Sequence, residues 1–325
     1  MSPFAVLLTV AVTAAPVVPD DPAYREQFSE AIRRHDGGDY AGAISIYRSM
    51  LKTWPHDPTV VYELAFSMSS SGVPPEELIT FIDAELKAQK QPNPKMYSLL
   101  GAANDGLKRY PEAERAFRKG LELDPKNGDL AFNLAVNLSF QNKPVAAEEQ
   151  FVKAVELAPD WPGIWRALGV NLEQNGKPID SIFARLNFLI LEPRAKRAEM
   201  SAAAIDALLE KLVKRDGKKI EVQVANKADL ALQMIFAAEL TNEPQGSERV
   251  VAGLESMIEA ALREKNTAAR AASLKRLAAA KKANCLTAAL WQYRRTLGDP
   301  AAETWFSKHA EDEERLRRFR EVSEQ

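Results

Sequence analysis

The residue types that most often carry chemistry are few in this 325-residue chain. Its histidines are His35, His56 and His309, and its one cysteine is Cys285. No two histidines are four residues apart, so none can form a zinc-binding pair on one helix face, and a single cysteine excludes an intramolecular disulfide or a cysteine-based metal cluster. The sequence also lacks Gly-rich phosphate loops and the Gly-x-Ser-x-Gly nucleophile motif. It therefore predicts no cofactor, no metal site and no enzyme.

One group of residues near the C-terminus could still act as an acid–base site. His309 lies close in sequence to Glu303, Trp305, Glu311 and Asp312. Acid–base catalysis requires a second group positioned beside the histidine, and carboxylates are abundant throughout this tail. As an alternative hypothesis, residues 196–325 contain a cryptic enzyme or a carbohydrate-binding module, with a pocket around these residues and the preceding repeats as a docking arm.

A basic stretch precedes this group. Its cations are Arg263, Lys265, Arg270, Lys275, Arg276, Lys281 and Lys282. No aromatic side chain is interleaved to stack on bases, and the formal net charge is −2, so we expect no nucleic-acid partner. Two interpretations stay open: a solvated helix face, or a contact for an acidic partner or a membrane surface. The alanines between the cations offer too little apolar area for a membrane anchor.

Three prolines divide the middle of the chain, from Pro94 onward, into units, and these units precede the basic stretch and the His309 group. Pro125, Pro159 and Pro193 each end an apolar run and are evenly spaced. Proline ends a helix, and a fixed period of about 34 residues, here called the repeat length, is typical of stacked helical hairpins. Small residues that allow close helix packing recur at fixed phases: Leu100-Gly101, Leu134-Ala135 and Leu168-Gly169, then Ala113, Ala147 and Ser181.

This pattern resembles the tetratricopeptide repeat (TPR) family. The resemblance implies an all-α fold, a TPR-type helical-hairpin solenoid. The same residue types extend backwards, with a short insertion placed at Gln89–Pro94, and give about five hairpins over residues 22–195. Arg185 and Phe188 stand where the family prefers an aromatic and a small residue, so we expect the fifth hairpin to pack as a transition to another structure.

After Pro193 the period is predicted to fail, and residues 196–325 are predicted to form a mostly helical C-terminal domain. We expect one helix over Ala195–Arg215 and one possible strand over Lys218–Ala225, where polar and apolar residues alternate. A lone strand must pair with an irregular segment or another chain, or lie over the helices. The residues expected to form a small core at the junction are Leu186, Leu189, Ile190, Trp291, Trp305 and Phe306. This organisation is similar to uncharacterised bacterial exported TPR proteins with a helical tail.

The resemblance also indicates where a ligand would bind, because the first helices of successive hairpins line the concave face of such a solenoid. The candidate residues on this face are Lys95, Ser98, Ala102, Asp129, Phe132, Val136, Arg166 and Val170. The family's basic clamp for a C-terminal carboxylate is not reproduced, because Ser98 and Ala102 occupy its positions. Phe132 and Val136 predict an apolar centre with charged edges, which suits a protein or peptide segment. In the other interpretation, the protein's own C-terminal region fills this groove.

The N-terminus predicts export. Phe4–Val12 is an uncharged apolar run followed by small residues, which is typical of a secretory signal peptide over residues 1–15. The sequence contains no candidate transmembrane segment. We therefore expect the protein in the periplasm or cell envelope of a bacterium, or in the cytoplasm if residues 1–15 are not a signal peptide.

Amino-terminal sequencing of protein isolated from its native cells tests this expectation. The mature chain should begin after Ala14 or Ala15, because signal peptidase requires small residues before the cleaved bond. Chain that still begins at Met1 would contradict export through this segment.

Overall fold

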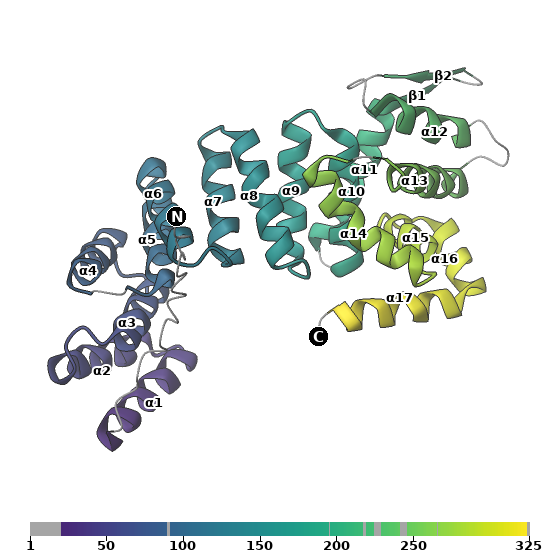
Figure 1. Cartoon of the computed structure of the whole chain (residues 1–325). Coiled ribbons are helices and arrows are strands. Elements are labelled where there is room, and N and C mark those ends of the chain that lie inside the picture. Colours follow the sequence, from purple (N-terminus) through teal and green to yellow (C-terminus); the bar gives the residue numbers. More distant parts are fainter. Residues whose placement is uncertain are drawn as a thin grey trace, which may run out of the picture. The chain divides into compact units, whose positions relative to one another are not determined.

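The computed structural model describes residues 21–89, 92–194, 196–216, 219–223, 229–240, 246–264 and 266–323. Within these ranges the chain is helical apart from one short β-hairpin (Figure 1). It divides into two compact units, Met1–Leu123 and Asp124–Gln325, which are described separately below. The predicted signal peptide, residues 1–15, lies outside the described residues.

The first unit consists of three helical hairpins. Its helices are α1 (Pro22–Asp36), α2 (Tyr40–Thr53), α3 (Pro58–Ser70), α4 (Pro75–Ala88), α5 (Pro94–Gly106) and α6 (Tyr110–Leu123). The first helix of each hairpin begins with a capping residue followed by proline: Asp21-Pro22, Asp57-Pro58 and Asn93-Pro94. At Asp57, for example, Oδ1 accepts hydrogen bonds from the backbone of Thr59 and Val60 at 3.0 and 2.9 Å. The cap satisfies free N–H groups, and proline fits the first helical position, so these dipeptides fix where each hairpin begins.

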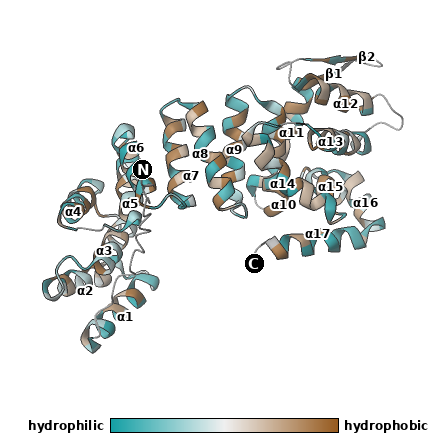
Figure 2. Ribbon diagram, in the orientation of Figure 1, coloured by the Kyte–Doolittle hydropathy of each residue, from teal (hydrophilic) through white to brown (hydrophobic). Residues whose placement is uncertain are grey.

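The second unit begins with two further hairpins and continues into the C-terminal region. Its helices are α7 (Gly128–Phe140), α8 (Pro144–Leu157), α9 (Pro162–Gln174), α10 (Pro178–Leu191), α11 (Lys196–Leu212), α12 (Leu230–Leu240), α13 (Ser247–Ala261), α14 (Ala268–Lys282), α15 (Leu286–Thr296), α16 (Pro300–Lys308) and α17 (Ala310–Ser323). Figure 2 shows α17 as largely hydrophilic, in keeping with Leu316 as its fully buried apolar residue.

The repeat continues half a unit further than the sequence predicted. Helices α5, α7, α9 and α11 begin at Pro94, Gly128, Pro162 and Lys196, so each start follows the previous one by the same repeat length. Helix α11 packs on α10 as the first helix of a sixth repeat. The period fails only at Val213, where a strand replaces the expected second helix. The prediction that it fails after Pro193 was therefore wrong.

The strand that begins at Val213 pairs with the strand predicted over Lys218–Ala225. Strand β1 (Val213–Asp216) pairs antiparallel with β2 (Lys219–Val222), with Val213 opposite Val222 and Arg215 opposite Ile220. The predicted helix over Ala195–Arg215 thus ends earlier, at Leu212, because Val213 and its neighbours satisfy the backbone groups of β2 instead. The end of the predicted strand, from Val224, lies outside the described residues.

Helix α10 is buried on all sides. Every side chain from Ile179 to Ile190 is buried, because α9, α11, α14 and α15 all contact this helix. The predicted junction residues Leu186, Leu189 and Ile190 are buried among them. Phe188, which replaces the small residue that the family prefers at this position, is buried as well. A helix that is covered on every side can be apolar all round.

Arg185 occupies an aromatic position without breaking the packing. Phe117 and Phe151 stand at the same phase of the two preceding hairpins, and a Cβ added at Gly101 would lie 2.3 Å from the Phe117 ring. In the fifth hairpin a Cβ at Gly169 would lie 2.9 Å from Arg185 Cγ. The arginine stem therefore fills the place of the phenyl ring, while its Nη2 reaches Glu173 Oε2 at 2.7 Å.

The aromatic residues of the C-terminal region form a second small core. Trp291 and Phe306 are buried, as the sequence predicted, and the Trp291 and Trp305 rings stack with centroids 5.7 Å apart. Trp305 itself is half-buried, and His309 stacks on it at 4.2 Å.

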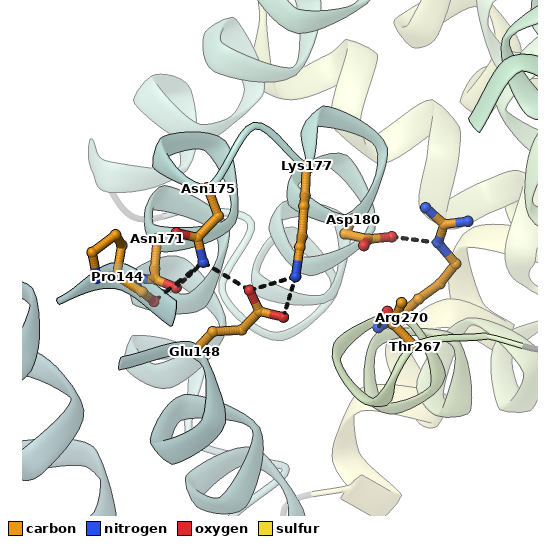
Figure 3. Close-up of polar contacts among 8 residues, drawn as sticks. All are labelled: Pro144, Glu148, Asn171, Asn175, Lys177, Asp180, Thr267 and Arg270. Atoms are coloured by element: carbon orange, nitrogen blue, oxygen red, sulfur yellow. Dashed lines mark hydrogen bonds and ion pairs between the residues drawn. The ribbon is translucent and has the colours of Figure 1, made fainter. Parts of the chain in front are cut away.

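Buried ion pairs join the C-terminal region to the repeats. Arg270 on α14 is buried and pairs with two buried carboxylates, Asp180 on α10 and Asp229 before α12. Figure 3 shows the Arg270–Asp180 pair, and beside it the Glu148 carboxylate between Asn175 and Lys177. Arg276 is also buried, and it pairs with Asp160 in the α8–α9 turn. The basic stretch is therefore not one solvated face, because two of its cations hold the fold together.

Trp165 tests the packing of the fifth hairpin. Its side chain is 1% exposed, and its Nε1 donates to the Pro159 carbonyl oxygen at 2.7 Å. Trp165→Ala should lower the free energy of unfolding by about 3–5 kcal/mol, as other large-to-small core changes do. The control is Trp161→Ala. Trp161 lies four residues earlier and its side chain is 39% exposed, so this change should cost under about 2 kcal/mol of unfolding free energy. Equal losses in urea unfolding would contradict the packing.

Arg270 tests the ion pairs. Arg270→Met leaves Asp180 and Asp229 buried without their cation, so it should cost about 3–5 kcal/mol of unfolding free energy. The control is Lys275→Met, on the exposed side of α14, which should cost little. Burial already raises the pKa of Asp180, and losing Arg270 raises it further. The folded variant then binds more protons than its unfolded chain as the pH falls. Its loss of unfolding free energy relative to the unmodified protein should therefore shrink as the pH is lowered from about 7 to about 5. A loss that grows over that range would count against the pairs.

Candidate functional site

The predicted site residues fall in both compact units. Lys95, Ser98 and Ala102 lie on α5 of the first unit. Lys95 and Ala102 are exposed, Ser98 is half-buried, and the Lys95 ammonium lies 5.6 Å from the Tyr62 ring. The remaining five lie on α7 and α9 of the second unit, so we build the candidate site from these two helices.

The sequence placed Phe132 on the open surface of α7, but in the structure its side chain does not project freely. Its ring is half-buried, with centroids 6.0 Å from Phe151 and 4.7 Å from Trp161. It joins the hairpin core to the surface because Phe151, on α8, is itself buried. The open aromatic surface belongs to Trp161, which covers Phe132 and is 39% exposed.

Sequence reasoning missed Trp161, although its position carried a signal. It stands one repeat length after Asn127 and two after Asn93, and both asparagines cap the helices that follow them. Trp161 makes no side-chain cap, so α9 loses an interaction worth about 1 kcal/mol. Gly163 leaves room for the indole, since a Cβ there would lie 3.1 Å from Trp161 Nε1. A repeat that gives up a cap for an exposed tryptophan marks this position as a binding candidate.

Apolar side chains continue this surface along both helices. Phe132, Val136 and Phe140 are four residues apart, so they follow one side of α7. Val136 is half-buried and Phe140 is exposed. On α9, Val170 is 38% exposed and stands one repeat length after Val136, at the same phase of the repeat. We call Phe132, Val136, Trp161 and Val170 the apolar strip.

Charged groups flank the strip. Asp129 is exposed in the first turn of α7, and Arg166 lies on α9 between Trp161 and Val170. The Nε of Arg166 is buried and has no hydrogen-bond partner among the described residues. Arg185 reaches Glu173, and its pKa is lowered chiefly by burial, which the Glu173 carboxylate opposes. Arg166 is half-buried and, unlike Arg185, forms no ion pair among the described residues, so no described carboxylate neutralises its charge.

The C-terminal region packs against other helices of the array. Helix α14 contacts α8 and α10, the second helices of the two hairpins. A cavity of about 340 Å³ beside α14 has Val155 of α8, Trp165 of α9, Ala272 of α14 and Phe319 of α17 in its walls. The charges at its edge pair internally, as Lys275 with Glu156 and Arg276 with Asp160. The contact involves α8, α10, the α8–α9 turn and Trp165 of α9, and none of the four residues of the apolar strip lines its cavity.

The alternative site around His309 does not converge. The Glu303 carboxylate is held by Arg295 at 2.8 and 2.9 Å, which lowers its pKa. His309 Nδ1 bonds to the Trp305 carbonyl oxygen at 2.8 Å. The Trp305 ring stacks on both Trp291 and His309, so the indole is not a free platform for a sugar ring.

Two other kinds of site have no candidate. In the part of the chain that the structure describes, no three histidine, cysteine or acidic side chains gather where they could hold a metal ion. Within the same ranges, no helix combines the length and the apolar character that crossing a membrane requires.

Comparisons with known proteins agree with the repeat. A tetratricopeptide repeat family model matches residues 94–127. The chain is 30% identical over 95 residues to cellulose synthase 2 operon protein C of Komagataeibacter xylinus, across 27% of this chain and 7% of that protein. It is 32% identical over 120 residues to small glutamine-rich tetratricopeptide repeat-containing protein 2 of Mycosarcoma maydis, across 36% of this chain and 33% of that protein. The chain thus spans a third or less of the length of these curated relatives.

Solved structures resemble part of the fold. A crystal structure of the MamA protein matches with a TM-score of 0.45 and 19% identity, over 52% of this chain and 91% of that one. A thermophilic TPR protein of Thermus thermophilus matches with a TM-score of 0.45 and 18% identity, over 56% and 98%. Three observations indicate the family: the even spacing of helix starts, the hairpins and the family-model match. The chain contains tetratricopeptide repeats.

Proposed function

We propose that this protein is a non-enzymatic scaffold that binds a peptide-like segment of a protein partner on the first-helix face of its second unit. The observation that carries the proposal is Trp161, an exposed indole at a position where the preceding repeats have a helix cap. It covers Phe132 at 4.7 Å and so offers a rigid aromatic surface. Aromatic residues of this kind supply much of the energy of protein interfaces.

The chemistry of this face defines the segment that it would bind. An apolar side chain of the partner would contact the apolar strip between α7 and α9. A carboxylate one or two residues away would reach Arg166, whose Nε lacks a partner among the described residues. Asp129, exposed at the start of α7, would disfavour acidic residues at that end and favour basic ones. We therefore expect a segment with an apolar anchor, an acidic residue on one side and a basic residue on the other.

The proposal also includes the compartment. The apolar run and small residues within positions 1–15 support export to a bacterial cell envelope, where the partner would then be found. If this segment is not a signal peptide, the same face would bind a cytoplasmic partner.

Site-specific photo-crosslinking in native cells would identify the segment. A photoreactive residue at Val170, 38% exposed on the strip, should give one partner peptide by mass spectrometry. The control is the same residue at Val145, which is 67% exposed at the start of the second helix α8 and should not give that peptide. Crosslinking of the same peptide at both positions, or at Val145 alone, would place the contact elsewhere.

The binding of that peptide, made synthetically, then tests the roles of the residues. Trp161→Ala should weaken binding at least about tenfold, because it removes the central apolar contact. Arg166→Met should weaken it less and make the affinity less sensitive to salt, because a rim charge mainly affects association and choice of partner. Isothermal titration calorimetry at two salt concentrations measures both effects. An unchanged affinity with Trp161→Ala would contradict the proposed face.

A further inference from the structure

A second cavity, separate from the apolar strip, lies where the C-terminal helix meets the end of the array. It has a volume of about 490 Å³ and is bordered by the α10–α11 turn and by α11, α15 and α17. Its charged lining residues are Arg194, Arg295, Arg317, Arg320, Glu199 and Glu313. Four cations therefore face two carboxylates around one cavity.

The partners of these arginines show which charges are already neutralised. Arg295 binds Glu303 at 2.8 Å and Glu313 at 2.5 Å. Arg317 binds both Glu314 and Glu321, at 2.7 and 2.8 Å. Among the described residues, neither Arg194 nor Arg320 forms an ion pair. The surplus positive charge of the cavity is therefore located at these two residues.

Arg320 is the more unusual of the two. Its Nε and Nη2 are buried, and neither has a hydrogen-bond partner among the described residues. Burial lowers the pKa of Arg320 to about 10, and the neighbouring Arg194 charge adds to this effect. Buried guanidinium nitrogens without an acceptor lose their hydration without compensation, and a second cation nearby increases the cost.

An anion in the cavity would offset the repulsion between the two unpaired cations that line it. It would accept hydrogen bonds from Arg320 and lie between two cations, as oxyanions do when arginine binds them. The volume is within the range of small-molecule sites, so the cavity can hold an organic anion and not only a single inorganic ion. Glu199 is exposed to solvent and Glu313 is bound to Arg295, and neither forms an ion pair with Arg320, although the Glu313 charge partly opposes the lowering of the Arg320 pKa.

We infer that this cavity binds a small multivalent oxyanion between Arg194 and Arg320. The chemistry shared by the candidate ligands is two or more negative charges on oxygen, which either phosphate or carboxylate groups provide. This inference does not depend on the proposed partner-binding face, because it concerns other helices and other residues.

Calorimetric titration of the full chain with pyrophosphate and with citrate, at ionic strength matched with sodium chloride, tests the inference. Saturable binding of one anion per chain is expected. Arg320→Met and Arg194→Met should each weaken it at least tenfold. The matched control is Arg318→Met, which removes an exposed arginine of α17 that is bound to Glu314 and should leave affinity unchanged. Preference for pyrophosphate would identify phosphate groups as the ligand chemistry, and preference for citrate would identify carboxylates.

Thermal unfolding without added anion separates a binding role from a structural one. Because Arg320 lacks partners, Arg320→Met should unfold at the same temperature as the unmodified protein or at a higher one, while losing the stabilisation that the anion gives. The inference is wrong if neither anion binds saturably, if Arg320→Met binds as tightly as the unmodified protein, or if Arg318→Met loses as much affinity.

Discussion

The complete burial of α10 is the constraint on which the second unit depends. A helix covered on every side must satisfy each of its polar side chains from a neighbour. Asp180 pairs with Arg270 of α14, Ser181 donates to the Gly169 carbonyl oxygen at 2.7 Å, and Asn187 donates to the Ser273 carbonyl oxygen at 2.8 Å. Two of these three partners lie on α14. The same contacts that satisfy α10 therefore fix the C-terminal region onto the repeats, which is why residues 124–325 form one compact unit.

This arrangement determines which surfaces stay available. A helical-hairpin array has two long faces, formed by its first and its second helices. Helix α14 contacts the second helices α8 and α10, and Arg276 extends that contact to the α8–α9 turn. The apolar strip on α7 and α9 is left out of this packing, which is why its exposed indole needs an explanation other than the fold. Helix α14 thus packs on the array mainly through α8 and α10, and the face that we propose for recognition lies on α7 and α9.

The parts of the fold that local sequence rules govern could be predicted. The proline period, the small residues between paired helices and the alternation in β2 each express a constraint that acts within a few residues or one repeat. The buried cations could not be predicted, because Arg270 is 90 residues from Asp180 and 41 from Asp229. A charged residue in a basic stretch looks solvated until the fold supplies its partner. The helix face that carries the candidate residues followed from the repeat and stays a prediction as a binding site. The contact of Trp161 with Phe132 could not be foreseen, because it depends on the turn before α9.

Two departures from local rules lie at the proposed sites: the missing cap at Trp161 and the two unsatisfied guanidinium nitrogens of Arg320. Such departures are expected at functional sites, because a fold optimised only for stability would remove them. Unsatisfied buried atoms are not sufficient evidence on their own, since the Tyr47 hydroxyl and the Gln233 amide also lack partners among the described residues. Neither of those lines a cavity found in the described parts of the chain, whereas Arg320 lines one and Trp161 lies on an open face. An unmet polar group or an exposed aromatic indicates a ligand only where there is also space for that ligand. Arg276 meets this condition at its Nε, but its Nη2 is already bound to Asp160 and to the Pro159 carbonyl oxygen. Arg320 forms no ion pair among the described residues, and Trp161 lies on an open face.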